Sequence, residues 1–321
     1  MIRRYDFAPL DGITRAVFRR VWLRRFGGAD RCFIPFLSPT PQHIITPRDL
    51  RELAPEDAGT LPLVPQIMTC RAPEFLWAAE VLGDMGFREV NLNLGCPSGT
   101  VTAKGKGSGF LRSPEALDAF FEEVFASVRL PVSVKTRLGY QSPEEFPRLL
   151  EIFSRYPIAC LTIHARVRPE KYRGPLHMDA FAEALARSAS PLCFNGDLQT
   201  VEDVRRLEAE FPEAEAVMIG RGAVADPALF RKLRGGPAAT REELQAFTRE
   251  LYREYQAFFG QTGTAAQRMR EVWFYLIHLF DGAERLNKQM RRFRTPGEYE
   301  AAEAAIFREL PLRQDAQGAL V

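Results

Sequence analysis

The chain has few cysteines and histidines, and neither occurs in a spacing typical of metal sites. Its five cysteines are scattered, odd in number and never in C-x-x-C spacing, which argues against a disulfide framework or structural zinc. Its four histidines form neither H-x-x-x-H nor H-E-x-x-H. We therefore expect no metal centre and a reducing environment.

Long apolar runs are also missing. The longest, from Val272 to Phe280, has nine residues and includes His278, so it is too short to span a bilayer. The N-terminus, Met1 to Asp6, has no signal-peptide apolar core. These absences predict a cytoplasmic protein without a membrane partner. The net charge of +2 is too close to neutral to indicate a polyanionic partner by itself.

Two nucleotide-binding signatures are absent as well. The glycine run from Lys104 to Gly109 does not match a Walker loop, because Gly107 stands where serine or threonine is needed. No G-x-G-x-x-G opens a helix after the first strand-like run, which disfavours a dinucleotide-binding open sheet.

What the chain does contain is eight short apolar runs that alternate with segments of helical periodicity. The runs lie at 5–9, 32–37, 63–68, 90–94, 132–137, 160–164, 191–195 and 216–220. An open doubly wound sheet would alternate in the same way, but the number of runs and the length they cover favour a (β/α)8 barrel, an α/β fold. We predict this TIM barrel.

The pattern changes after Pro227, and from Thr240 onward the chain has helical periodicity only. We predict a barrel domain over residues 1–235, a hinge at 234–240, an all-helical domain over 240–312 and a frayed tail over 313–321.

Polar side chains follow the strand-like runs at their carboxyl ends, where active sites of such barrels lie. They are Asp11, Gln66, Asn93, Cys96, Lys135, Arg137, His164, Arg166, Asn195, Asp197 and Arg221. Polar residues that are there only because the surface is solvated would rarely recur at the end of so many strand-like runs.

Cys96 has the most informative setting. The strand-like run ends at Gly95, and Pro97 cannot donate to a strand ladder, so Cys96 lies just past a strand end. A lone cysteine is usually a small buried apolar residue, but this position favours a functional thiol. Asn93, three residues earlier, has an amide that can both donate and accept.

The last two strand ends, Asn195-Gly196-Asp197 and Gly220-Arg221-Gly222, occupy positions where such barrels often hold a phosphate. Alternatively, Gly196 and Gly222 only form tight turns.

Lys135 ends an otherwise buried strand, and a buried ammonium needs an anionic partner. We interpret it as stabilising negative charge on a cofactor ring during electron transfer, with a solvated rim lysine as the alternative. His164 is either a phosphate or cofactor contact or a core histidine bonded to backbone.

The segment from Arg285 to Arg294 carries five basic residues and no acidic one. Its arginines together with Phe293 are typical of a helix that meets RNA phosphates, although most charge runs are only solvated helix faces.

Taken together, several motifs resemble those of the tRNA-dihydrouridine synthases. They are Ala8-Pro-Leu-Asp-Gly-Ile-Thr14, Pro65-Gln66, Asn91-Leu-Asn-Leu-Gly-Cys-Pro-Ser98, Val134-Lys-Thr-Arg-Leu-Gly139, Thr162-Ile-His-Ala-Arg166, Tyr172-Arg-Gly-Pro175, Asn195-Gly-Asp197 and Gly220-Arg-Gly-Ala223. The order is kept over nearly the whole chain. Leu10 stands where the family usually has Met, Lys104 is extra in the glycine run, and Leu176 to Asp179 replace the usual Ala-Asp-Trp. These departures concern the choice of target uridine rather than the chemistry.

The resemblance implies bound FMN, with NADPH as reductant and a uridine of tRNA as substrate. It implies that Pro9, Leu10, Asp11, Gln66 and Lys135 surround the flavin ring, and that His164, Asn195, Gly196, Asp197, Gly220 and Arg221 lie toward its phosphate. Cys96 would donate a proton to C5 of the uracil, while Asn93, Arg137 and Tyr172 would hold the uracil edge. The thiol must then stay protonated, so its pKa should not be depressed. We expect a monomer.

Two other functions remain open from the sequence. One is an FMN-dependent barrel reductase of a small molecule, similar to a dihydroorotate dehydrogenase, although the basic helix argues against it. The other is a non-catalytic RNA-binding relative, against which Cys96, Lys135 and Asn93 argue.

Overall fold

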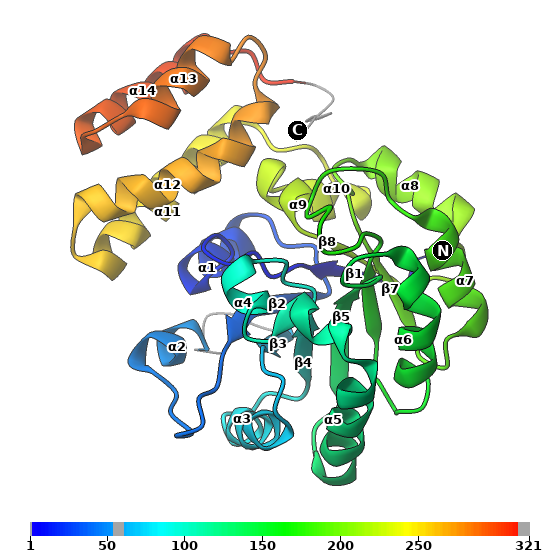
Figure 1. The fold of residues 1–321 in the computed structure, drawn as a ribbon. Helices are drawn as coiled ribbons and strands as arrows, with labels where there is room; N and C mark the ends of the chain where they lie inside the picture. The colour runs from blue at the N-terminus through cyan, green and yellow to red at the C-terminus, as the bar shows by residue number, and fades with distance from the viewer. Residues whose placement is uncertain (1, 54–60, 314–321) are drawn as a thin grey trace.

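The computed structural model of the protein describes residues 2–53 and 61–313. Eight parallel strands pair in sequence order and close where β8 pairs with β1 (Figure 1). They are β1 (Arg4–Phe7), β2 (Arg31–Leu37), β3 (Leu63–Ile67), β4 (Val90–Leu94), β5 (Val132–Arg137), β6 (Leu161–His164), β7 (Leu192–Asn195) and β8 (Ala216–Ile219). The predicted (β/α)8 barrel is confirmed.

Helices connect the strands and cover the outside of the barrel. They are α1 (Ala16–Arg25), α2 (Pro47–Glu52), α3 (Ala72–Asp84), α4 (Gly99–Thr102), η2 (Gly107–Arg112), α5 (Pro114–Ser127), η3 (Pro143–Glu145), α6 (Phe146–Phe153), α7 (Met178–Arg187), α8 (Val201–Glu210), α9 (Arg221–Ala225) and α10 (Leu229–Leu233). Their ends follow local chemistry: in α8, the Thr200 hydroxyl accepts from the Asp203 N–H and the Asp203 carboxylate accepts from the Thr200 N–H. No helix among the described residues is both long and apolar enough to cross a membrane.

Two apolar clusters hold the barrel together. A small one fills its interior and contains Phe33, Val64, Cys160, Cys193 and Met218. The larger one lies between the strands and the surrounding helices and continues into the C-terminal helices. This division is expected of a barrel whose strands are buried on both faces.

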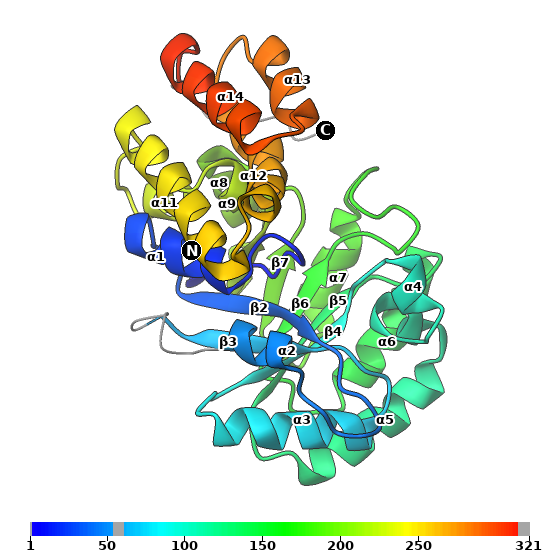
Figure 2. The same ribbon diagram turned by 90° about the vertical axis from the view of Figure 1, so that its left-hand side faces the viewer.

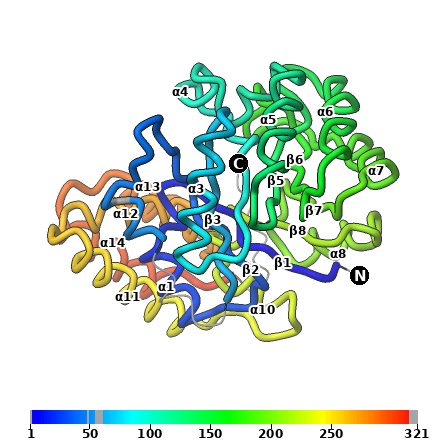
Figure 3. The backbone as a smooth tube through the Cα atoms, turned by 90° about the horizontal axis from the view of Figure 1, so that it is seen from below, coloured from blue at the N-terminus to red at the C-terminus, as the bar shows by residue number. Residues whose placement is uncertain are grey.

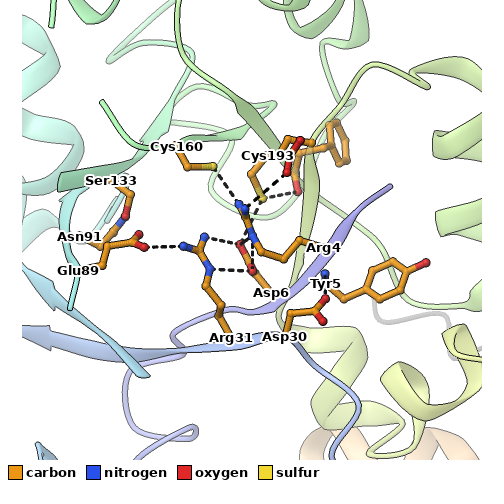
Figure 4. Close-up of polar contacts among 12 residues, drawn as sticks. Arg4, Tyr5, Asp6, Asp30, Arg31, Glu89, Asn91, Ser133, Cys160 and Cys193 are labelled. Carbon is orange, nitrogen blue, oxygen red and sulfur yellow. Dashed lines mark hydrogen bonds and ion pairs between the residues drawn. The ribbon is translucent and has the colours of Figure 1, made fainter. Parts of the chain in front are cut away.

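Paired charges close the amino-terminal end of the barrel (Figure 4). The fully buried Asp6 carboxylate accepts from Arg4 Nε at 3.0 Å and from Arg31 Nη2 at 2.9 Å. Arg31 Nη1 also donates to Glu89 at 2.6 Å, and Arg4 Nη2 contacts Cys160 Sγ at 3.2 Å. Because a buried charge is costly without a partner, the paired charges can close this end of the barrel. The carboxyl ends of the strands lie at the opposite end.

Four helices follow the barrel: α11 (Arg241–Phe259), α12 (Thr262–Leu276), α13 (Glu284–Arg292) and α14 (Pro296–Glu309), with η4 (Ile277–Leu279) after α12. They gather on one side of the barrel, away from α5 and α6 (Figures 2 and 3). Helix α11 packs on α1, and α12 packs on α9, next to the end of β8. The helices therefore border the carboxyl ends of the strands. The predicted domain boundaries stay a prediction, and residues 314–321 of the predicted tail lie outside the described residues.

One expectation for the basic segment is wrong. Phe293 is only 5% exposed and packs against Arg270 and Tyr299, so it cannot stack on RNA. Arg285 pairs with Glu309 of α14, an acid that lies distant in the sequence. Arg291, Arg292 and Arg294 remain exposed.

Candidate active site

A cavity of about 480 Å³ opens at the carboxyl ends of the strands, a size typical of ligand sites. All but one of the site residues predicted from the sequence line it; Arg166 lies outside the lining and bonds to Asp197 and the Gly174 carbonyl. Those that line it are Pro9, Leu10, Asp11, Gln66, Asn93, Cys96, Lys135, Arg137, His164, Tyr172, Asn195, Gly196, Asp197, Gly220 and Arg221. Their individual roles stay predictions.

The Cys96 loop is held rigidly at the end of β4. The Asn93 side-chain oxygen accepts from the backbone N–H groups of Gly95 and Cys96, both at 3.0 Å, and the Ser108 hydroxyl donates to the Cys96 carbonyl at 2.8 Å. Gly107 packs beneath: a Cβ there would lie 2.9 Å from the Cys96 carbonyl oxygen. The thiol therefore has a fixed place on the cavity wall.

Burial raises the pKa of the Cys96 thiol above its usual value, while a hydrogen bond from the Ser98 backbone and the charges of Arg137 and Lys135 act in the opposite direction. The thiol is thus protonated near neutral pH, as a proton donor must be. This is opposite to a nucleophilic cysteine, whose pKa is lowered.

Asn93 belongs to a buried chain of amides across the barrel. Its Nδ2 donates to Gln66 at 2.6 Å, Gln66 Nε2 donates to Asn91 at 2.8 Å, and Asn91 Nδ2 donates to Ser133 at 2.9 Å. With its oxygen already accepting two bonds, Asn93 retains one N–H for a ligand. Its main work in this structure is to orient Gln66 and the Cys96 loop.

Lys135 reaches the cavity floor from β5, and its ammonium donates to Asn195 Oδ1 at 2.8 Å. Asn195 Nδ2 donates to the Met218 carbonyl at 2.7 Å, and this second bond fixes the orientation of the Asn195 amide. Burial, helped by the nearby Arg137 charge, lowers the pKa of Lys135 to about 7. Within residues 2–53 and 61–313, the hydrogen-bond partner of the Lys135 ammonium is an uncharged amide, so the site favours an added anion.

Arg137 and Tyr172 lie together at the cavity wall. The Arg137 side chain is 2% exposed and donates to the carbonyls of Gly95 at 2.8 Å and Val167 at 3.1 Å. Its guanidinium lies 5.5 Å from the Tyr172 ring centroid, and that of Arg221 lies 5.2 Å away. Tyr172 is 48% exposed, so its ring stands between two cations and the solvent.

His164 is buried, and its Nδ1 has no hydrogen-bond partner among the described residues. Burial lowers the pKa of His164 well below its usual value, and the neighbouring Arg137 and Lys135 lower it further. The imidazole is therefore neutral, lines the cavity, and keeps one buried ring nitrogen without a partner among the described residues.

The ends of β7 and β8 meet through an ionic contact. Asp197 accepts from Arg166 Nη1 at 2.9 Å and from Arg221 Nη2 at 2.7 Å, so Arg221 already has a counter-ion. A Cβ on Gly196 would lie 2.7 Å from Leu176 Cδ2, and one on Gly222 would lie 2.3 Å from the Leu198 carbonyl oxygen. The backbone contact accounts for Gly222, and a φ of +145° favours glycine at 196. A phosphate contact at these two turns stays a prediction.

The loop after β1 completes this side of the cavity. The Leu10 backbone N–H donates to Thr14 Oγ1 at 2.8 Å, and Asp11, exposed at the rim, pairs with Arg15 at 2.8 Å. Gly220 lies against this loop: a Cβ added at Gly220 would be 3.5 Å from Leu10 Cδ2. The first and last βα loops are therefore in contact.

Residues 6–310 match the sequence model of a family described as dihydrouridine synthase (Dus). The chain belongs to the dihydrouridine synthase family. It is 30% identical to "Probable tRNA-dihydrouridine synthase 1" of Synechocystis, over 88% of this chain and 80% of that protein. It is also 30% identical to "tRNA-dihydrouridine(16) synthase" of Pseudomonas putida, over 89% of this chain and 91% of the other.

Among solved structures, a morphinone reductase variant in complex with tetrahydroNAD shares the fold, with a TM-score of 0.55 and 14% identity. The match covers 74% of this chain and 88% of the reductase. At this identity the likeness extends to the barrel alone, and it supports the fold of this dihydrouridine synthase family member rather than its chemistry.

Sequence reasoning missed several cavity residues of this dihydrouridine synthase family member. Phe36 comes from β2, Arg173 follows Tyr172, and the helical part contributes Phe274, Tyr275 and His278. The strand-end rule could have indicated Phe36. No sequence signal indicates the last three, since their contact with the cavity depends on how α12 docks.

Proposed function

We propose that the protein reduces a uridine of tRNA to 5,6-dihydrouridine, with FMN as bound coenzyme and NADPH as its reductant. The observation that carries this proposal is the Cys96 thiol, fixed on the cavity wall and kept protonated by burial, in a chain of the dihydrouridine synthase family. A protonated thiol beside a cavity is suited to general acid catalysis.

The residues present fit a flavin phosphate ester. In the part of the chain that the structure describes, Lys135 bonds to an uncharged amide and His164 Nδ1 is buried without a hydrogen-bond partner. Pro9, Leu10, Asp11, Gln66 and Lys135 would surround the ring. Asn195, Gly196, Asp197, Gly220 and Arg221 would lie toward the phosphate with His164. Asp197 would act there by orienting Arg221 rather than by direct contact, because a carboxylate repels a phosphate.

When bound and reduced by NADPH, FMN supplies the hydride that C6 of the uracil accepts. Cys96 then donates its Sγ proton to C5, which neutralises the charge that hydride addition leaves on the pyrimidine. Arg137 and Lys135 add positive potential at the same wall. Asn93, Arg137 and Tyr172 hold the uracil edge, and the Asn93 bonds to the Cys96 loop keep the thiol in reach.

A uridine reaches this cavity only after leaving its stack, since the reacting carbons are inaccessible in a folded loop. We propose that the helices at 240–312 bind tRNA phosphates while the barrel at 1–235 binds the coenzyme. The exposed Arg291, Arg292 and Arg294 support this division. We further propose that the protein acts as a monomer, which light scattering of the purified protein can test.

The direct experiment is to purify the protein and add an unmodified tRNA transcript with NADPH. We expect a yellow protein that releases FMN on denaturation and adds two hydrogens to one uridine, detected by mass spectrometry of the digested tRNA. NADH should be a poorer reductant. A colourless protein that leaves every uridine unchanged would refute the proposal.

A further inference from the structure

Phe274 is an unusually exposed aromatic residue at the cavity rim. It lies on α12, whose Met269, Val272, Trp273 and Leu276 are buried, yet Phe274 itself is 45% exposed. Among the described residues, the exposed large hydrophobic side chains are Ile44, Leu50, Tyr172 and Phe274. The two aromatic ones, from parts of the chain that are distant in sequence, line the same cavity.

The position of Phe274 is fixed relative to the barrel. Helix α12 packs on α9, and Arg268 Nη1 donates to the Gly12 carbonyl at 3.4 Å, next to the loop that carries Leu10 and Asp11. The Tyr275 ring meets the Phe274 ring edge-on, with centroids 5.0 Å apart. The docking of α12 thus holds Phe274 at the cavity opening, with one edge against Tyr275 and the rest of the ring exposed.

The chemistry of this rim favours nucleic acid. Arg173 is exposed beside Tyr172, Arg221 lies against the Tyr172 ring, and both arginines line the cavity. Exposed aromatic rings beside positive charge are the usual way to bind unpaired nucleotides, because every base offers a face for stacking. A flipped uridine remains joined to its two neighbours, so these nucleotides must lie at the rim while the uracil is inside.

We propose that Phe274 stacks on the base next to the flipped uridine, so that the helical part helps to select the target directly. This inference rests on the proposed function. It assigns to α12 a base contact that is distinct from the phosphate contacts of the α13 segment. Tyr275 and Arg268 serve as supports for the ring.

The test compares Phe274→Ala and Phe274→Trp with Leu50→Ala, which removes an exposed apolar side chain on α2 outside the cavity. Each FMN-bound enzyme is assayed with tRNA and, separately, for NADPH oxidation without tRNA. We expect Phe274→Ala to lower kcat/KM for tRNA by about 5- to 150-fold, the range of one base-stacking contact. Phe274→Trp should restore it, and Leu50→Ala should have no effect. NADPH oxidation should be unchanged in all three.

A tRNA that lacks one base next to the target identifies the contact. Loss of the stacked base should weaken the wild-type enzyme and leave Phe274→Ala with no further defect. The inference is wrong if Phe274→Ala is as active as wild type. It is also wrong if the defect of Phe274→Ala relative to wild type is the same with a tRNA that lacks the base before the target and with one that lacks the base after it. An increased KM for NADPH would instead assign Phe274 to the reductant. If wild type forms no dihydrouridine, the proposed function itself fails.

Discussion

Replacing Lys135 with Met should stabilise the ligand-free protein, and the gain should shrink as the pH rises. Burial lowers the pKa of Lys135 from 10.5 to about 7. At 1.36 kcal/mol per pKa unit, this difference disfavours the folded protein by up to about 5 kcal/mol while the ammonium is charged. Because solvent still reaches Lys135 through the cavity, this figure is an upper bound.

The sign follows from proton linkage. Below pH 7 both the folded and the unfolded chain bind the proton, so the full cost applies. Between pH 7 and 10.5 only the unfolded chain keeps the proton, so the cost declines by about 1.4 kcal/mol for each pH unit. At about pH 9.5 roughly 1.4 kcal/mol remains. Met also leaves Asn195 Oδ1 without its donor, a loss of about 1–3 kcal/mol that does not depend on pH.

The assay is urea unfolding of flavin-free protein at about pH 6, 8 and 9.5. We expect Lys135→Met to have a free energy of unfolding above that of wild type by at most about 2–4 kcal/mol at the lowest pH, and to lose this advantage at the highest. Lys288→Met, on the exposed face of α13, is the control and should show no such trend. A Lys135→Met difference that is constant with pH would refute a depressed Lys135 pKa.

The same charge should act oppositely once an anion is bound. FMN binding to wild type near pH 8 should take up a proton at Lys135, because an adjacent anion raises the pKa of an ammonium. Calorimetry in buffers of different ionisation enthalpy measures this uptake. Lys135→Met should bind FMN more weakly and take up no proton, and an equal uptake by both proteins would contradict the assignment.

Three further changes separate chemistry, RNA binding and stability. Cys96→Ala should keep bound flavin and NADPH oxidation while dihydrouridine formation falls by about 10²- to 10⁴-fold, as for loss of a general acid; rapid-quench assays measure this. Reversing the charges of Arg291, Arg292 and Arg294 should weaken tRNA binding and reduce its salt dependence, by roughly 0.7–0.9 in log–log slope per lost contact, in filter-binding titrations. Asp6→Asn should lower the free energy of unfolding by about 3 kcal/mol, because the half-buried Arg4 and Arg31 lose the carboxylate that lies between them, while the flavin spectrum is unchanged.

For each of these three predictions, one result would contradict it. Unchanged dihydrouridine yield from Cys96→Ala would remove the acid role. Unaltered affinity and salt slope after charge reversal would leave α13 as a solvated face. An Asp6→Asn protein as stable as wild type would mean that water replaces the lost carboxylate at the barrel end.

Much of the fold was predictable because its signals are local. The eight apolar runs became strands with ends shifted by only a few residues; the first, predicted at 5–9, is a strand over Arg4–Phe7. Helix α1 begins only at Ala16, because Ile13 and Thr14 first form a turn against Leu10. Alternation and capping depend on neighbouring residues, so one sequence suffices to find them.

The interactions of the site were less predictable than its membership. Asn93 was predicted to hold the uracil, yet three of its bonds hold Gln66 and the Cys96 loop. Arg221 was predicted to face a phosphate, and in this structure it pairs with Asp197. A side chain's type shows which bonds it can make, whereas its neighbours decide which ones it does make.

By itself, the sequence determined the barrel, its open end and the chain segments that meet there, because strand ends in a parallel barrel share one rim whatever the side chains do. Only the tertiary structure decided that Phe274, on a helix far along the chain, lies at that rim, and that Lys135 is buried deeply enough to lower its pKa. Both outcomes depend on how distant surfaces pack and exclude water, and no periodicity within a single segment records this.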